Sequence, residues 1–270
     1  MDNDIEPPSY DHAIQSNEQV FRFGKYKDAT YDSFERGEMF IQAFSSQLDT
    51  FPKREVQQVK EKGFLSVIRM DDHTQTNELF KHPYSPQPFI LTGHTLQFWP
   101  QVQQMPIPYD LDVTAQASHP FLCLKDVDST NQSATHHYFE ITVCQVLSNE
   151  TVIAIGLSTR PYPIFRMPGW NKYSVGYHSD DGHKFCDDAT GGQEYGPSWG
   201  PGDTIGCGYC PEWGQVYFTK NGLRLDTAFT HLSSHHYFPS VGVDGPATLK
   251  VNFGQYPFQY QINSWAGQFM

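Results

Sequence analysis

The chain has little charge, and most of the charge it has is negative. Only 18% of its 270 residues are charged, and 30 Asp and Glu against 18 Lys and Arg give a formal net charge of −12. A nucleic-acid-binding surface needs an excess of basic residues, because the phosphates that it contacts are negative. A polybasic patch for anionic lipids needs the same excess. The composition therefore argues against nucleic acid as a partner.

Long apolar runs are also missing. No stretch approaches the roughly 18 consecutive apolar residues that a membrane-spanning helix needs. No cationic segment with an apolar run after it starts the chain, so a secretory signal peptide is not expected. The five cysteines are odd in number and irregularly spaced, which fits a reducing compartment better than a disulfide framework. Together these absences predict a cytoplasmic protein with no direct membrane span.

Aromatic residues, glycine and proline, by contrast, are plentiful. Aromatic residues make up 15% of the chain, beside 21 Gly and 19 Pro. This composition is typical of many short strands joined by tight turns. The length allows one large domain or two small ones, either of which can bury a full core. A mainly β fold is expected.

The first sixty residues are predicted to hold a tail and two helices. Residues 1–31 are polar and acidic, which predicts a disordered tail. In residues 32–51, Asp32 and Glu35 form a capping-box pattern, and apolar residues then recur at helical spacing. A shorter helix over 54–62 is expected to end at Gly63 in a left-handed cap. The apolar residues expected to face the domain from the first helix are Phe34, Ile41, Phe44, Leu48 and Phe51.

From residue 64 onward the apolar pattern changes to a period of two. Asp181-Gly182 and Asn221-Gly222 predict hairpin turns, since Asn-Gly readily adopts the positive φ angles of a type I′ turn. Residues 100–136 are the least regular and are expected to contain an insertion loop around a short apolar run at 121–124. The series predicts an antiparallel β-sandwich. Its expected strands are 64–70, 95–99, 138–146, 152–157, 173–177, 183–185, 203–209, 215–219, 238–243 and 248–253.

Residues 138–254 carry a family pattern. It begins with Arg-Pro-Tyr-Pro-Ile-Phe-Arg-Met-Pro-Gly-Trp at 160–170 and Tyr-Ser-Val-Gly-Tyr-His-Ser-Asp-Asp-Gly at 173–182. Gly-Asp-Thr-Ile-Gly-Cys-Gly-Tyr at 202–209 and Phe-Thr-Lys-Asn-Gly at 218–222 follow, then Phe-Pro-Ser-Val-Gly at 238–242 and Val-Asn-Phe-Gly-Gln at 251–255. This order of motifs resembles a SPRY domain. The resemblance implies a non-catalytic, protein-recognising sandwich, with no cofactor expected.

The resemblance suggests a division of the chain into four parts. The SPRY domain is expected over 137–256, after the tail over 1–31. Residues 32–136 are expected to hold the helical segment, the flanking strands and the loop. Residues 257–270 are expected to be a C-terminal extension.

Two groups within the SPRY family share features with this chain. Pro-Tyr-Pro at 161–163, Gly-Trp-Asn-Lys-Tyr-Ser at 169–174 and the closing Val-Asn-Phe-Gly-Gln are similar to fungal SPRY proteins of the endosome and vacuole. Those proteins are adaptors for a WW-domain HECT ubiquitin ligase. Asp-Asp-Gly-His-Lys-Phe-Cys at 180–186 and Tyr-Gly-Pro at 195–197 are similar to Ran-binding protein M, a scaffold subunit of a multisubunit RING ubiquitin ligase. Residues 59–64 also resemble the fungal adaptors, and they favour that group.

The tail contains a PPxY motif made by Pro7, Pro8 and Tyr10. Two prolines favour a polyproline II helix, which lies across the aromatic groove of a WW domain at little cost in conformational entropy. The resemblance therefore implies recruitment of a WW-domain HECT ligase and a location in the cytoplasm or peripherally at endosome or vacuole membranes. The fungal adaptors carry a membrane helix before the SPRY domain and their PPxY motifs after it. This chain shows no apolar run long enough for such a helix and has its motif at residues 7–10, so membrane anchoring is not expected here. A chance match in a proline-containing chain is the alternative.

A second candidate site is the loop over 160–170, which is expected to bind a cargo protein. Arginine, tyrosine and tryptophan together are typical of interaction hot spots on loops. The alternative is that these aromatic residues fill core positions and that the prolines protect a sheet edge. The residues proposed for cargo binding are Arg160, Tyr162, Arg166, Trp170 and Tyr177.

Two other chemistries find less support. The spacings His183-x2-Cys186 and Cys207-x2-Cys210 suit zinc, but residues three apart in one strand point to opposite faces. Histidine pairs at 136–137 and 235–236 are candidate general bases, yet no nucleophile or phosphate-binding motif accompanies them. Neither a metal site nor an enzyme is expected.

Overall fold

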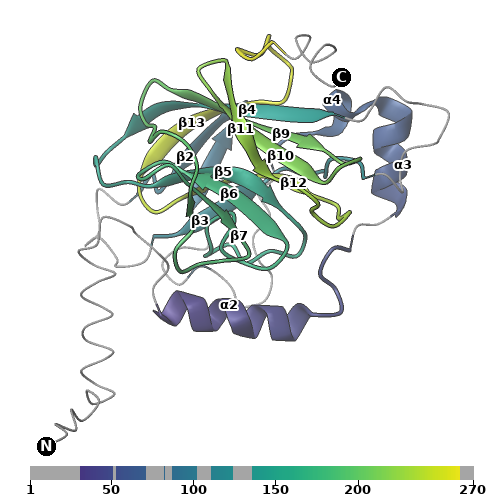
Figure 1. Cartoon of the computed structure of the whole chain (residues 1–270), viewed down its shortest axis with the longest axis horizontal. Helices are drawn as coiled ribbons and strands as arrows, with labels where there is room; N and C mark the ends of the chain where they lie inside the picture. The colour runs from purple at the N-terminus through teal and green to yellow at the C-terminus, as the bar shows by residue number, and fades with distance from the viewer. Residues whose placement is uncertain are drawn as a thin grey trace, which may run out of the picture.

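Two antiparallel sheets face each other in the computed structural model, which describes residues 31–50, 53–70, 82, 87–101, 111–123 and 136–261 (Figure 1). In spatial order the seven-stranded sheet contains β1 (Phe89–Thr92), β2 (Thr95–Phe98), β13 (Ala247–Asn252), β4 (His137–Val146), β9 (Thr204–Cys210), β10 (Gln215–Lys220) and β11 (Leu223–Phe229). The six-stranded sheet contains β3 (Val113–Gln116), β12 (Phe238–Val243), β5 (Ile153–Ser158), β6 (Ser174–His178), β7 (His183–Cys186) and β8 (Gln193–Glu194). The predicted antiparallel sandwich is confirmed.

The core lies between the two sheets. Phe139, Ile141 and Val143 alternate along β4 and are at most 1% exposed, as the period of two predicts. Residues of β5 and β12 from the other sheet belong to the same core. Glu140 faces outward on β4 but is buried as well, because the segment after β13 folds over it and the backbone N–H of Gln259 donates to its carboxylate.

The tight turns follow the sequence signals. Asn221 and Gly222 have φ angles of 51° and 78°, and they join β10 to β11. Gly182 has a φ of 75° between β6 and β7. Both hairpin predictions are confirmed, because each turn joins two strands that pair antiparallel. The positive φ angles are those that Gly and Asn adopt most readily.

One predicted strand is wrong. Residues 64–70 contain a short helix, α4 (Phe64–Val67), and only Met70 forms an isolated bridge, to Ala117. The preceding helix α3 (Lys53–Lys62) is where the sequence predicts it. Gly63 has a φ of 78°, as expected of a helix-ending glycine, but its ψ of 145° is extended rather than left-handed helical. Its N–H still donates to the Val59 carbonyl, so the chain leaves one helix and enters the next at once.

Helix α2 (Tyr31–Phe44) lies across the outside of the six-stranded sheet (Figure 1). It ends at Phe44 rather than at residue 51, and a turn over 45–49 follows it. The predicted buried face is only partly right. Phe44 and Leu48 pack against the cluster of Phe40 and Phe165, but Phe34 is 38% exposed, whereas Ser33 and Phe40 are fully buried. Residues 1–30, 51–52 and 262–270 lie outside the described residues. Among the helices that are described, none is long and apolar enough to cross a bilayer.

Candidate protein-binding site

The β5–β6 loop (residues 159–173) crosses the outer face of the six-stranded sheet. Two glycines on that face leave space for it. A Cβ at Gly176 would lie 2.1 Å from the Pro168 carbonyl oxygen, and one at Gly242 would lie 2.5 Å from Pro168 Cδ. His178 Nε2 donates to the same carbonyl at 2.9 Å, and burial lowers the pKa of His178 to about 4. The loop is therefore packed onto the sheet rather than projecting from it.

Arg166 occupies the centre of this loop with its side chain only 1% exposed. Its Nη2 donates to the Trp170 carbonyl at 3.2 Å, and its guanidinium lies 5.3 Å from the centre of the Trp170 ring. Its backbone carbonyl accepts a hydrogen bond from Thr114 Oγ1 at 2.5 Å. Because a buried charge is stable only with such partners, the contacts with Trp170 hold the guanidinium in one place, and the hydrogen bond from Thr114 holds the backbone.

The other residues proposed for cargo binding have structural contacts of their own. Tyr162 is buried and donates to the Met167 carbonyl at 2.7 Å, while Tyr177 lies in the core between the sheets. Arg160 is half-buried, with Nη2 donating to the Ala117 carbonyl at 2.7 Å. In this arrangement Tyr162, Arg166, Trp170 and Tyr177 face protein rather than solvent.

Helix α2 covers this loop. Ser33 Oγ accepts a hydrogen bond from Arg166 Nη1 at 3.1 Å, and the guanidinium of Arg36 lies 4.0 Å from the centre of the Phe165 ring. Phe40 packs with Phe165 in a small separate cluster. Ser33, Gly37 and Phe40 do lie at helical spacing in the sequence. The prediction favoured the larger apolar residues beside them, Phe34 and Ile41, as the buried face.

The chain after α2 is held to the domain by an acidic contact. Asp49 Oδ2 lies 2.8 Å from His235 Nδ1, and Asp49 Oδ1 accepts a hydrogen bond from the His236 backbone N–H at 2.6 Å. Burial by itself raises the pKa of Asp49, but the hydrogen bonds from both histidines outweigh burial and lower this pKa well below its usual value. The ionised form is thus favoured, and it fixes residues 45–49 against the loop before β12.

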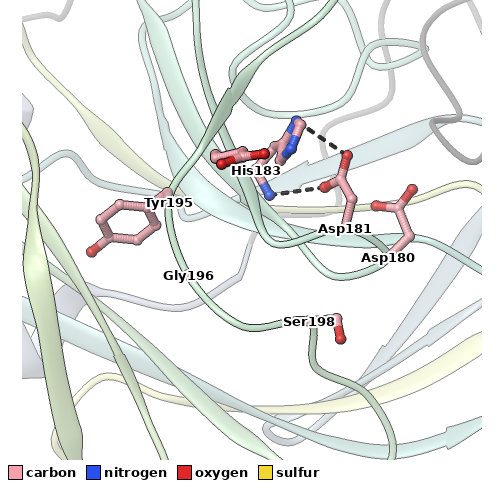
Figure 2. Close-up of a pocket in the computed structure, with 7 residues that line it drawn as sticks. Asp180, Asp181, His183, Tyr195, Gly196 and Ser198 are labelled. Carbon is pink, nitrogen blue, oxygen red and sulfur yellow. Dashed lines mark hydrogen bonds and ion pairs between the residues drawn. The ribbon is translucent and has the colours of Figure 1, made fainter.

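An open acidic hollow of about 620 Å³ lies at the β6–β7 turn, beside β8 and the segment that follows it (Figure 2). Figure 2 shows Asp181 beside His183, whose backbone N–H donates to the carboxylate at 2.8 Å. Carboxylates suit a basic side chain or backbone N–H groups of a peptide, and no Lys or Arg belongs to the lining. Its lining residues are Asp180, Asp181, His183, Glu194, Tyr195, Gly196 and Ser198. This hollow was not predicted from the sequence, because its two segments, 180–183 and 194–198, are brought together only by the pairing of β7 with β8.

The remaining candidates from the sequence are the PPxY motif and the possible zinc ligands. Pro7, Pro8 and Tyr10 lie outside the described residues. Cys207 is fully buried in the core, and burial raises the pKa of its thiol well above the usual value. Within the described part of the chain, no group of three or more His, Cys, Asp or Glu is arranged to hold a metal ion.

Comparison with known proteins bears on the same region. The model of the SPRY domain family matches residues 136–256. Protein ssh4 of Sclerotinia sclerotiorum is 45% identical over 132 residues, which are 48% of this chain and 25% of that protein. Ran-binding protein 9 of Danio rerio is 40% identical over 147 residues, which are 51% of this chain and 24% of that protein. This chain thus spans about a quarter of the length of these relatives.

A solved structure of a human SPRY domain is 27% identical to this chain, with a TM-score of 0.49, and the match covers 63% of this chain and 98% of that one. The family match spans β4 to β13 and includes the β5–β6 loop and the acidic hollow. The family match thus places a SPRY domain at residues 136–256 of this chain.

Proposed function

We propose that this protein is a non-catalytic adaptor. Its SPRY domain binds a cargo protein, and Pro7, Pro8 and Tyr10 recruit a WW-domain HECT ubiquitin ligase, so that the cargo is ubiquitinated and then sorted or degraded. The observation that carries the proposal is the presence of a SPRY domain at 136–256 and a PPxY motif at 7–10 in one chain. We place this activity in the cytoplasm and peripherally at endosome or vacuole membranes, following the resemblance to the fungal adaptors.

The motif has the chemistry that such a ligase requires. Pro7 and Pro8 favour the extended helix that a WW domain binds, and Tyr10 fills the neighbouring pocket. Acidic residues at positions 2, 4, 6 and 11 surround the motif and attract a basic partner. A single contact of this kind is weak, so several WW domains or clustered cargo must act together.

The cargo site is proposed to include the β5–β6 loop. Arg160, Tyr162, Arg166, Trp170 and Tyr177 are the residues assigned to it. Tyr162, Arg166 and Trp170 are buried, so they shape the surface beneath α2 and around the loop, while Tyr177 supports it from the core between the sheets. Direct contact by Arg166 or Trp170 with cargo requires this part of the chain to open.

Titration of isolated WW domains with the full-length protein tests the ligase-docking step. Tyr10→Ala should weaken binding at least tenfold, because the tyrosine pocket is left empty. Tyr26→Ala, a second tail tyrosine outside any PPxY motif, is the matched control and should leave the affinity unchanged. Equal affinities for the wild type and Tyr10→Ala would rule out docking through this motif.

The alternative is a scaffold or substrate-receptor subunit of a multisubunit RING ubiquitin ligase. The similarity to Ran-binding protein 9 over 147 residues favours it. Affinity purification followed by mass spectrometry separates the two proposals. A WW-domain HECT ligase that is lost with Tyr10→Ala supports the adaptor, whereas RING-ligase subunits retained by the same variant support the scaffold.

A further inference from the structure

Helix α2 covers a surface of the β5–β6 loop that has the features of a helix-binding groove. This surface, which we call the groove, is formed by Phe165, Arg166 and Asn171. We propose that this groove binds a helix of the cargo protein, and that α2 is its resident occupant, which the cargo helix displaces. The inference rests on the proposed function only in taking the SPRY domain to bind a protein. It adds the chemistry of the bound segment and the means by which binding is controlled.

Three positions of α2 match three features of the groove. Ser33 Oγ accepts from Arg166 Nη1 at 3.1 Å and donates to the Phe165 carbonyl at 3.4 Å. At Gly37 the helix approaches so closely that a Cβ would lie 3.0 Å from Asn171 Oδ1 and 3.2 Å from Arg166 Nε. Phe40 is fully buried in its cluster with Phe165.

These positions form a single stripe along the helix, because residues i, i+4 and i+7 lie on one face. Phe34, Glu35, Glu38 and Met39 between them are exposed. A helix of 14 residues is marginal on its own in water, so α2 depends on its contacts with the domain, which also include Arg36 over the Phe165 ring and Phe44 against the Phe40–Phe165 cluster. Because these contacts form a small cluster separate from the main core, α2 can open without unfolding the sandwich.

Part of the groove is held by the sandwich and by the loop itself. The Arg166 side chain is held by the Trp170 carbonyl, and its backbone N–H donates to the Pro163 carbonyl at 3.2 Å. Thr114 Oγ1 donates to the Arg166 carbonyl from β3. These partners lie in the sandwich or in the loop and remain when the helix leaves, whereas Phe165 and Arg166 Nη1 lose the partners that α2 supplies. An incoming helix that replaces those partners therefore meets a largely preorganised site, which lowers the cost of binding.

The segment after α2 is fastened separately. Asp49 is bound by His235 and His236, and the Thr50 backbone N–H donates to the Arg160 carbonyl at 3.2 Å. Release of α2 therefore does not require release of the residues that follow it. After release, α2 stays tethered beside the groove and competes with any helix that enters.

The chemistry of the groove defines the partner. The bound helix presents a hydroxyl to Arg166, a glycine four residues later where the backbones approach, and an aromatic residue three residues after that. This is the pattern Ser-x3-Gly-x2-Phe of α2 itself, and it is a form of helix-in-groove recognition. Since α2 is in the same chain, its high effective concentration demands a tight or clustered partner.

A fluorescent peptide of residues 31–44 serves as the probe, with full-length protein as the receptor. Gly37→Leu in the protein introduces a branched side chain where a Cβ alone would already lie 3.0 Å from Asn171 Oδ1, and so it displaces the protein's own α2. The peptide should bind this variant at least tenfold more tightly than the wild type, whose groove is occupied. Glu38→Leu, on the exposed face of the same helix, is the matched control and should bind the peptide like the wild type.

Two further measurements make the result decisive. Phe40→Ala in the protein weakens the same contact by removing a side chain and should also admit the peptide, whereas a peptide that itself carries Gly37→Leu should bind none of these proteins. The circular dichroism and unfolding midpoint of the sandwich show that each variant is folded. Equal binding to wild type and Gly37→Leu, or no binding to either variant at millimolar peptide, overturns the proposal. Neither a WW domain nor the PPxY motif takes part in this assay, so it fails or succeeds independently of ligase docking.

Discussion

Gly208 in β9 lies opposite Tyr217 in β10, and the tyrosine ring covers it. A Cβ at Gly208 would lie 2.1 Å from Tyr217 Cζ and 2.2 Å from Cε1, well inside any allowed contact. The ring has little freedom to move away, because it is fully buried and its hydroxyl lies 2.7 Å from His136 Nε2. The Arg224 guanidinium also lies 4.4 Å from the ring centre on one side. Gly208→Ala must therefore displace this ring.

The cost follows from three contributions. Overpacking a filled site costs about 1–3 kcal/mol. Loss of the hydrogen bond between Tyr217 and His136 adds about 0.5–1.5 kcal/mol. The reduced entropy of the unfolded chain offsets about 0.4–1 kcal/mol of this. We expect Gly208→Ala to lower the free energy of unfolding by about 0.5–4 kcal/mol.

The same substitution should act differently once the ring is gone. Tyr217→Leu removes the atoms that collide with the new methyl group, so in that background Gly208→Ala should be neutral or stabilising by up to about 1 kcal/mol. Urea unfolding of the four proteins in this double-mutant cycle measures the difference. Gly191→Ala, where a Cβ meets nothing within 4 Å, is the control and should change stability by less than about 0.5 kcal/mol. An equal effect of Gly208→Ala in both backgrounds would refute the argument.

Two further predictions concern pH. Asp49→Asn tolerates the φ of 60° but loses the carboxylate whose pKa is lowered, against the effect of burial, by hydrogen bonds from His235 and His236. Because a lowered carboxyl pKa stabilises only the ionised form, the variant should be about 1–3 kcal/mol less stable above about pH 5, and the difference should shrink below about pH 4 in urea titrations. His178 is buried with its pKa lowered to about 4, so the unfolded chain takes up a proton below about pH 6.5 that the folded chain does not. As the pH is lowered from about 6.5 to about 4, His178 should therefore contribute a loss of stability of up to about 1.4 kcal/mol per pH unit. His178→Gln should reduce the total slope by this amount, and an unchanged slope contradicts the assignment.

The strands were predictable where their signals are local. The alternation along β4 and the Asn221-Gly222 turn each depend on a few neighbouring residues, and both are confirmed. The apolar run Phe64–Val67 is equally short, but a run of four residues fits one helical turn as well as one strand. The outcome there depended on Gly63, which allowed α4 to follow α3 without an extended segment between them.

The orientation of α2 was not predictable from the helix alone. Phe34 has the aromatic side chain expected of a core position, yet Gly37 lies on the buried face. The reason is that the partner surface is a loop with a guanidinium and an amide rather than an apolar sheet. A loop residue 133 positions from Ser33 supplies part of that surface, so the spacing of Ser33, Gly37 and Phe40 could not be recognised as its match from residues 32–51 alone.

The role of the loop over 160–170 could not be predicted from its own residues either. Arginine and tryptophan are frequent both in interaction hot spots and in the interiors of loops, because their flat, polarisable groups form many contacts in either place. Composition alone therefore could not decide whether Arg166 and Trp170 face a partner or the protein. Their burial depends on Gly176 and Gly242 beneath the loop and on α2 above it.

The strength of the α2 contact decides how accessible that surface is. Burial of Phe40 contributes about 2–3 kcal/mol, and the Ser33 hydrogen bonds contribute about 1–2 kcal/mol more. A docking free energy of about 3–5 kcal/mol leaves an open fraction of about 10⁻² to 10⁻⁴, and the apparent affinity of a competing helix falls by the same factor. A lone cargo helix would then bind poorly. Clustered cargo, or cargo that is held at the same time by a ligase whose WW domains bind the tail, would overcome the competition from α2. On this reasoning, docking of α2 makes cargo binding and ligase recruitment depend on each other.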